Sequence, residues 1–233
     1  MTFRQGFKDG LAIGLGYLSV SFSFGIMAVS SGLTWWQALL ISITNLTSAG
    51  QVAGVGIMSA SGGLIEMAIS QLIINMRYSL MAISLSQKTD KTMTVPARLF
   101  DSYFITDEIF GVACSQDQVG FRYMTGLSVL PVLGWTLGTF LGALSGNLLP
   151  QVVTASLAIG IYGMFIAIVL PVCKKSRTIS IICVISVVMS VIFRYVPFLH
   201  AHVSSGFAII ICAVTAALIG VFIMPQDEEA QDG

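Results

Sequence analysis

Three short stretches put polar side chains into otherwise apolar sequence, and these are the residues that could do chemistry. They are ITNLTSAGQVAG at 43–54, INMRYSLMAISLSQK at 74–88 and TDEIFGVA at 106–113. In hydrocarbon, polar groups are tolerated only where they face protein or line a wet cavity. The three stretches together offer hydroxyl and amide groups, one guanidinium and two carboxylates, which is a set suited to a charged solute.

The first stretch interrupts segment 34–60, which otherwise has the composition of a membrane-spanning helix. Its small and polar residues predict a break at Thr47–Gln51. A helix that begins near Gly50 would present N–H groups and the positive end of its dipole, which suits a carboxylate. The alternative is close helix–helix packing through small residues, which needs no substrate.

The charged candidates lie in the second and third stretches. Arg77 either reaches along its helix to water or faces the interior and pairs with a carboxylate. Asp107 and Glu108 are expected to bind Arg77, a substrate ammonium group or a proton, whereas the alternative is a hydrated helix at the membrane edge. Because Asp101 and Glu108 are seven residues apart, we expect them to share one helical face.

The composition identifies an all-α polytopic membrane protein. Of the 233 residues 55% are hydrophobic and 9% are charged, and the mean hydropathy is +0.89. Soluble domains carry about 25% charged residues. We expect one transmembrane domain over 1–233, with a cytoplasmic N-terminus at 1–9 and a disordered acidic tail at 225–233.

Several function classes receive no support from the sequence. Zero net charge does not indicate a nucleic-acid partner, and the four cysteines lack the spacing of a disulfide or metal site. P-loop, H-E-x-x-H and G-x-S-x-G motifs are absent from the sequence. We therefore expect no enzyme, no metal and no cofactor.

The apolar segments must position the three polar stretches, and their number constrains the topology. The positive-inside rule places the basic N-terminus, loop 87–98 and loop 173–177 in the cytoplasm. Three segments separate each successive pair of these basic stretches, so one of each three must enter and leave on the same side. Segments 34–60 and 99–115 are the natural re-entrant or broken elements. About six full crossings remain, with both termini cytoplasmic: 11–29, 63–86, 123–147, 152–172, 178–196 and 204–223.

Paired interrupted segments are typical of transporter sites built from an inverted repeat, although the sequence shows no clear internal repeat. Other features predict structural roles. Glu66 lies near the end of its segment and is expected to be an interfacial carboxylate. A stripe of small residues suited to close helix packing follows Pro131, at Gly134, Gly138, Gly142 and Gly146.

The three stretches resemble the motifs of the AzlC-type branched-chain amino acid permeases, the large subunit of the LIV-E exporters. The resemblance rests on FSFGIMAVSSGL followed by A-G-Q-V-A, on I-N-M-R-Y-S-L-M and on T-D-E-I-F, in similar order and spacing over about residues 3–225. The first family motif is typically F-A-G-A-A-Q-F, where this chain has Leu46–Val52. The second usually reads N-L-R-H, and here Tyr78 replaces the histidine.

The resemblance implies an exporter of leucine, isoleucine or valine in a bacterial cytoplasmic membrane, working with a small AzlD-type membrane subunit. Proton coupling and a homo-oligomer are compatible with it. The start of the helix in the first motif, with Arg77, would bind the carboxylate, and Asp107 or Glu108 the ammonium. The alternatives are a non-transporting membrane scaffold and an exporter of another small amphipathic solute. The expected substrate-binding residues are Asn45, Thr47, Ser48, Gly50, Gln51, Asn75, Arg77, Thr106, Asp107 and Glu108.

Overall fold

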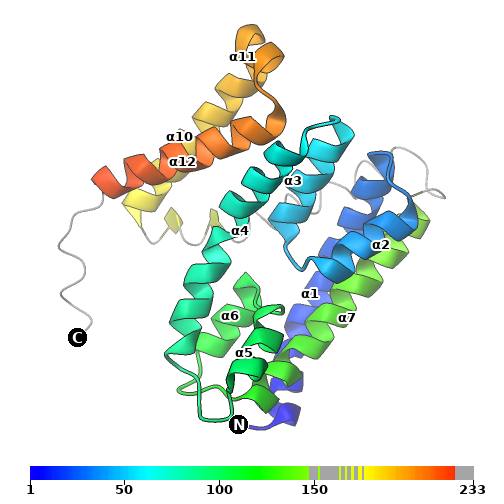
Figure 1. Ribbon diagram of the computed structural model, residues 1–233, viewed down its shortest axis with the longest axis vertical. Helices are drawn as coiled ribbons and strands as arrows, with labels where there is room; N and C mark the ends of the chain where they lie inside the picture. Colours follow the sequence, from blue (N-terminus) through cyan, green and yellow to red (C-terminus); the bar gives the residue numbers. More distant parts are fainter. Residues whose placement is uncertain are drawn as a thin grey trace. The chain divides into compact units, whose positions relative to one another are not determined.

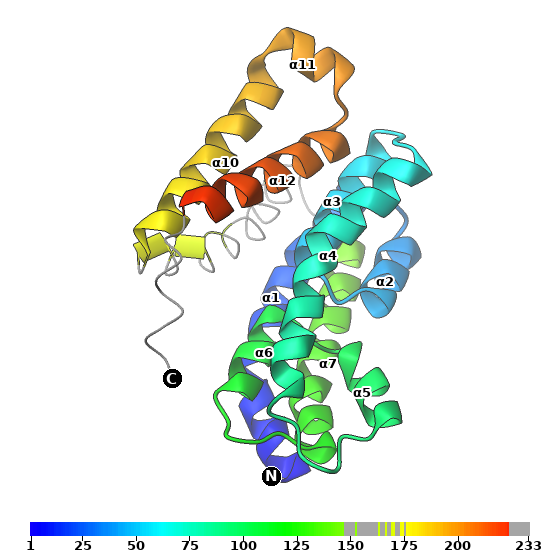
Figure 2. The ribbon, with the colours of Figure 1, turned by 60° about the vertical axis from the view of Figure 1, so that its left-hand side comes forward.

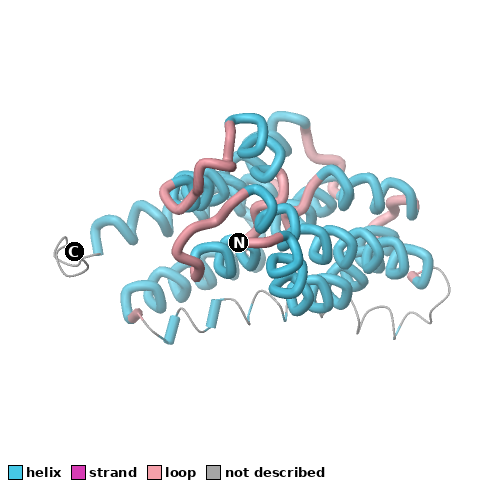
Figure 3. Tube along the Cα trace, turned by 90° about the horizontal axis from the view of Figure 1, so that it is seen from below, coloured by secondary structure: helices cyan, strands magenta, loops and turns pink. Residues whose placement is uncertain are grey.

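The computed structural model describes residues 1–146, 152, 163, 166, 169, 170, 173, 174 and 176–223. Helices and connecting loops make up these residues, and no strand occurs among them (Figure 3). The helices in Figure 1 are α1 (Phe3–Ser30), α2 (Trp35–Thr44), α3 (Ser48–Ser59), α4 (Leu64–Ser86), α5 (Val95–Ser102), α6 (Asp107–Cys114), α7 (Phe121–Ser145), α10 (Arg177–Tyr195), α11 (Pro197–His202) and α12 (Ser205–Ile223).

The predicted class is confirmed: the chain is an all-α polytopic membrane protein. Within the described residues, α1, α4, α7 and α10 are long and apolar enough to cross a membrane, and Gly206–Phe222 of α12 is a shorter apolar helix. These five helices correspond to five of the six predicted crossings. The sixth, 152–172, falls almost wholly outside the described residues, and the predicted tail at 225–233 lies outside them entirely.

The chain divides into two compact units. The first comprises Met1–Val55 and Ile74–Tyr162, and the second comprises Gly56–Ile73 and Gly163–Gly233, each as far as its residues are described. All ten predicted substrate-binding residues belong to the first unit. The expectation of one transmembrane domain stays a prediction.

Helices α1 and α7 form the centre of the first unit, where they lie side by side and run in the same direction (Figure 1). Gly134 lies against the backbone of Gly14, and Gly142 lies against the backbone of Phe22. The predicted small-residue stripe is thus a helix-packing surface. Because lipid tails are as apolar as leucine, such close contact is a main source of helix association in a membrane.

Helix α4 runs in the opposite direction to α1 and α7 (Figures 1 and 2). Leu85, near the end of α4, packs in one buried cluster with Tyr123 at the start of α7. Gly6, near the start of α1, lies against the same Tyr123. The basic N-terminus and the basic loop after α4 therefore lie at one end of the unit, as the topology argument requires.

Both interrupted segments are consequently re-entrant. Helices α2 and α3, of 10 and 12 residues, are joined by residues 45–47 and fold back on each other between the end of α1 and the start of α4. Helices α5 and α6, of 8 residues each, lie between the end of α4 and the start of α7. All four are shorter than the about 20 residues that a crossing needs. The two hairpins enter the unit from opposite ends.

Two expectations about these hairpins are wrong in detail. The first break lies at Asn45–Thr47 rather than at Thr47–Gln51, because the Thr47 hydroxyl caps a helix that already begins at Ser48. Segment 99–115 is two helices, so Asp101 and Glu108 do not share a face. A turn after Asp101 ends α5, since its carbonyl accepts the N–H of Phe104 at 3.0 Å.

In the second unit, Glu66 is not an interfacial carboxylate. Its side chain is buried and accepts hydrogen bonds from the Ser204 hydroxyl at 2.5 Å and from the Gly206 N–H at 2.9 Å. The carboxylate therefore satisfies the start of α12, where negative charge is favourable.

We predict that Gly142→Ala destabilises the protein, because the added Cβ would collide with the Phe22 carbonyl of α1, which is backbone and cannot rotate away. Overpacking of this kind costs about 1–3 kcal/mol, to be measured as the thermal unfolding midpoint in detergent. Gly16→Ala in α1 is the matched control, since no atom lies within 4 Å of its Cβ. Equal midpoints for the two variants would contradict this role for the stripe.

Candidate functional site

The tips of the two re-entrant hairpins meet inside the first unit. The Tyr103 hydroxyl, from the link between α5 and α6, donates a hydrogen bond to the Ile43 carbonyl in the last turn of α2. A cavity of about 230 Å³ lies at this meeting point. Its wall combines the two tips with two residues of α4: Thr44, Asn45, Leu46, Thr47, Asn75, Tyr78, Ser102, Tyr103 and Ile105.

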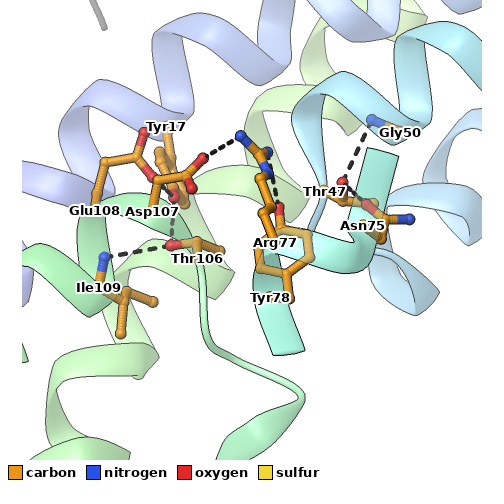
Figure 4. A network of polar contacts seen from close by, with 10 residues as sticks. All are labelled: Tyr17, Thr47, Gly50, Asn75, Arg77, Tyr78, Thr106, Asp107, Glu108 and Ile109. Carbon is orange, nitrogen blue, oxygen red and sulfur yellow. Dashed lines mark hydrogen bonds and ion pairs between the residues drawn. The ribbon is translucent and has the colours of Figure 1, made fainter. Parts of the chain in front are cut away.

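On one side of the cavity, Thr47 organises the start of α3. Its hydroxyl oxygen accepts the Gly50 N–H at 3.3 Å, and its hydroxyl proton is donated to Asn75 Oδ1 at 2.7 Å (Figure 4). Capping satisfies one of the first N–H groups of the helix, which otherwise have no partner inside the helix. Thr47 thereby connects the broken first hairpin to α4.

Thr106, the residue after Ile105 of the cavity wall, caps α6 in the same way. Its side chain accepts the Ile109 N–H at 3.3 Å and lies 2.7 Å from the Tyr17 hydroxyl oxygen of α1. The Tyr17 hydroxyl also donates to the Glu108 carboxylate. Each hairpin tip therefore ends in a threonine that begins the next helix, and each threonine is tied to a spanning helix.

Arg77 lies between the two threonine-capped helix starts (Figure 4). Its guanidinium forms an ion pair with Asp107 at 2.9 Å and donates to the Tyr78 hydroxyl at 3.3 Å. Arg77 and Asp107 side chains are 40% and 29% exposed, so their pairing is screened and contributes only modestly to stability. The carboxylate partner considered for Arg77 is observed, and it is Asp107.

Gln51 lies in a different environment. The Gln51 side chain is 2% exposed, donates to the Ser42 hydroxyl at 3.0 Å and accepts the Trp135 indole N–H at 3.0 Å. Ser42 in turn bonds to the hydroxyl of Thr139 at 2.7 Å. This network joins α2, α3 and α7, and Gln51 is not part of the cavity wall.

The structure thus brings together most of the residues expected from the sequence. Asn45, Thr47 and Asn75 line the cavity, and Ser48 and Gly50 form the first turn of α3. The acidic motif forms the start of α6, next to Arg77. Gln51 is the exception.

Sequence reasoning missed two tyrosines, Tyr17 and Tyr103. Each carries a hydroxyl group within or beside an apolar segment, and a buried tyrosine hydroxyl usually finds a hydrogen-bond partner. That signal singles out Tyr17 in the first span, but it does not indicate that the partners are Thr106 and Glu108.

The family model described as "AzlC protein" matches residues 12–149, more than half of the sequence. The chain belongs to the AzlC family. The match includes both re-entrant hairpins and helix α7. The AzlC region therefore contains every residue of the candidate site. The resemblance carried by the three motifs is confirmed.

Curated relatives of this AzlC protein are named as membrane proteins. It is 24% identical to "Inner membrane protein YgaZ" of Escherichia coli over 98% of this chain and 94% of that protein. It is 27% identical to an "Uncharacterized membrane protein" of Archaeoglobus fulgidus, over 72% of this chain and 75% of that one. No solved structure matches the chain.

We predict that Gln51→Leu lowers the free energy of unfolding in detergent by about 1–3 kcal/mol, since it leaves the buried Trp135 N–H without its acceptor. Gln118→Leu, at an exposed glutamine in the loop before α7, is the control and should change stability by no more than about 0.5 kcal/mol. If Gln51→Leu were as stable as the control, the network would not hold the first hairpin.

Proposed function

We propose that this AzlC-family protein is a secondary transporter, and not an enzyme, that exports branched-chain amino acids across the bacterial inner membrane. The observation that carries the proposal is the cavity between the two hairpin tips. Thr47 in its wall caps α3, Ile105 in its wall directly precedes the cap of α6, and Tyr78 in its wall accepts a hydrogen bond from Arg77 of the ion pair. Broken helices whose ends point at a central site are the usual construction of secondary transporter sites.

The carboxylate of the substrate would bind between the start of α3 and Arg77. First-turn N–H groups and the helix dipole favour an anion there. The Arg77 Nε atom is buried and has no hydrogen-bond partner within the described residues. An incoming carboxylate would supply that partner.

The ammonium group of the substrate would bind Asp107, with Glu108 held beside it by Tyr17. A zwitterion can therefore replace the Arg77–Asp107 ion pair by two new pairs, one at each end of the substrate. Because the original pair is partly exposed, separating it costs little. Binding would then change the contact between α4 and the second hairpin.

The apolar side chain of the substrate would enter the cavity beside Leu46 and Ile105. A volume of about 230 Å³ lies below the range of about 300–1,000 Å³ typical of sites for drug-sized molecules. This size favours a small aliphatic amino acid. The three resembling motifs support leucine, isoleucine or valine within that class.

The resemblance also supports a small AzlD-type membrane subunit as partner, and the name of the YgaZ relative supports the inner membrane. The basic N-terminus and the basic loop after α4 lie at the same end of the first unit, which supports a cytoplasmic N-terminus. We propose the same side for the C-terminus, and a homo-oligomer is compatible with this arrangement.

A second candidate function is that of a membrane scaffold whose polar residues only join helices, and the fully bonded Gln51 network favours it. Cysteine accessibility separates the two. In a protein whose native cysteines are replaced by alanine, we predict that Ser48→Cys, at the start of α3, and Ser102→Cys, in the cavity wall, react with a small aqueous thiol reagent and that leucine slows both reactions. Gln51→Cys, at the buried position, should react little. A scaffold would leave all three sites insensitive to leucine.

The direct test is efflux of preloaded labelled leucine from proteoliposomes, with and without a co-reconstituted AzlD-type subunit. We predict that Arg77→Ala and Asp107→Asn each reduce efflux by about tenfold or more, the loss expected when a charged hydrogen-bonding partner of about 1.5–3 kcal/mol is removed. Asp117→Asn, at an exposed acid in the loop before α7, should transport like wild type.

The same variants show whether the loss is functional or structural. Because the ion pair is partly exposed, its removal should change the free energy of unfolding by only about 0.2–1 kcal/mol. Wild-type proteoliposomes that release no leucine, either alone or with the small subunit, would refute the amino-acid proposal.

A further inference from the structure

Asp101, in the last turns of α5, is a buried acid that the proposed substrate site does not use. Its side chain is 2% exposed. Neither carboxyl oxygen has a hydrogen-bond partner within the part of the chain that the structure describes. An ionised carboxylate in that position would be strongly disfavoured, because a buried charge needs a partner.

The neighbouring helix α7 offers Asp101 one hydroxyl group. Thr125 of α7 is the polar side chain beside Asp101. Its own hydroxyl proton is donated to the Phe121 carbonyl at 2.8 Å. The Thr125 oxygen can therefore accept a hydrogen bond from protonated Asp101. Turned toward ionised Asp101, the same hydroxyl would donate and lower its pKa, an effect smaller than that of burial.

A cavity lies beside Asp101 and extends to exposed polar residues. It has a volume of about 350 Å³ and is bordered by the end of α4, by α5 and by Met124 of α7. Asp101 contributes to its wall together with the exposed residues Ser86 and Ser102. Asp101, Ser86 and Ser102 are polar groups in its wall that can hydrogen-bond to water.

The charged and titratable groups on the surrounding elements are engaged elsewhere or exposed. Arg98, on α5 itself, donates to the Met93 carbonyl and to the Thr89 hydroxyl, both at 3.0 Å. Lys88, after α4, donates to the Cys114 carbonyl at 2.5 Å.

The remaining charged and titratable groups near Asp101 are also exposed or bonded to other residues. Asp90, in the loop after α4, accepts from the N–H of Thr92 at 2.8 Å. On α7, Tyr123 donates to Asp9 at 2.8 Å and Arg122 is exposed. The described groups thus leave Asp101 without an ionic partner, and burial raises its pKa from 3.8 to about 7.

We propose that Asp101 is the proton-binding residue that couples transport to the proton gradient, an inference that rests on the proposed transport function. One proton from cavity water binds a carboxylate oxygen and gives a neutral acid that packs against α7 beside Thr125. Release returns that proton to water and leaves a carboxylate that must be hydrated, so α5 can no longer pack as closely.

This change would reach the substrate site through the backbone. Ser102, the next residue, lines both the Asp101 cavity and the cavity at the hairpin tips. Between about pH 4 and 7 the packed form of α5 holds a proton that a hydrated Asp101 would release, because the two pKa values are 3.8 and about 7. The packed form is therefore most favoured below about pH 4, and its advantage falls as the pH rises from there to about 7.

The test compares wild type with Asp101→Asn in proteoliposomes, using two assays for labelled leucine. Asparagine resembles the neutral acid in shape and carries no exchangeable acid proton. In leucine–leucine exchange without a gradient, the variant should stay within about twofold of wild type, because the hairpin-tip site is unchanged. In gradient-driven efflux, a difference of about one pH unit should change the wild-type distribution of leucine about tenfold per coupled proton, and that of the variant not at all.

Asp117→Asn, which removes an exposed acid, should keep the full response to the gradient. An Asp101→Asn variant that still responds like wild type would overturn the proposal. Wild type without leucine exchange would instead defeat the proposed function.

A second measurement keeps the two proposals separate, because it needs no transport. Infrared difference spectra of the purified protein should show the carbonyl band of a protonated carboxylic acid that disappears as the pH rises through about 7. The band should be missing in Asp101→Asn and present in Asp117→Asn. If the same titrating band persists in Asp101→Asn, the proton is bound elsewhere and the assignment is wrong.

Discussion

A helix that stops inside a membrane protein leaves backbone N–H groups that lipid cannot satisfy, and this chain meets that constraint twice. Thr47 and Thr106 each supply a hydroxyl acceptor for the helix that follows, and each is held by a residue of a spanning helix. The two breaks are therefore stable structures rather than local irregularities. Because protein groups bond to the free N–H groups at both breaks, polar residues can lie close together around one cavity.

The hairpins are positioned by the close contact between α1 and α7. Glycines bring the two backbones together, and the same helices provide Tyr17 and Trp135, which bond to the second and first hairpin respectively. The two helices that pack most closely thus also carry the side chains that hold the hairpins. A change in the separation of α1 and α7 would alter both hairpins, because each is attached to that pair by a hydrogen bond.

The polar groups of the first unit differ in how readily they can exchange partners. Gln51 is buried with its amide bonded at both ends, so it serves to hold the first hairpin. Arg77 and Asp107 are partly exposed and can separate at little cost, which suits a substrate contact. Asp101 is buried without a partner, and a group in that state is sensitive to a proton rather than to a larger ligand. Three different roles follow from burial and bonding.

The sequence by itself determined the membrane class, the four described helices long enough to cross a membrane, two interrupted segments, the small-residue stripe and the family motifs. Hydropathy, charge bias and residue spacing suffice for these because they are local properties of the chain. Only the tertiary structure decided that Tyr17 belongs to the site, that Gln51 lies outside the cavity wall and that Asp101 is unpartnered. Tyr17 is 89 residues from Thr106, and Gln51 is 84 residues from Trp135. Those pairings arise when helices distant in sequence pack together, and no local pattern specifies which side chains will then face each other.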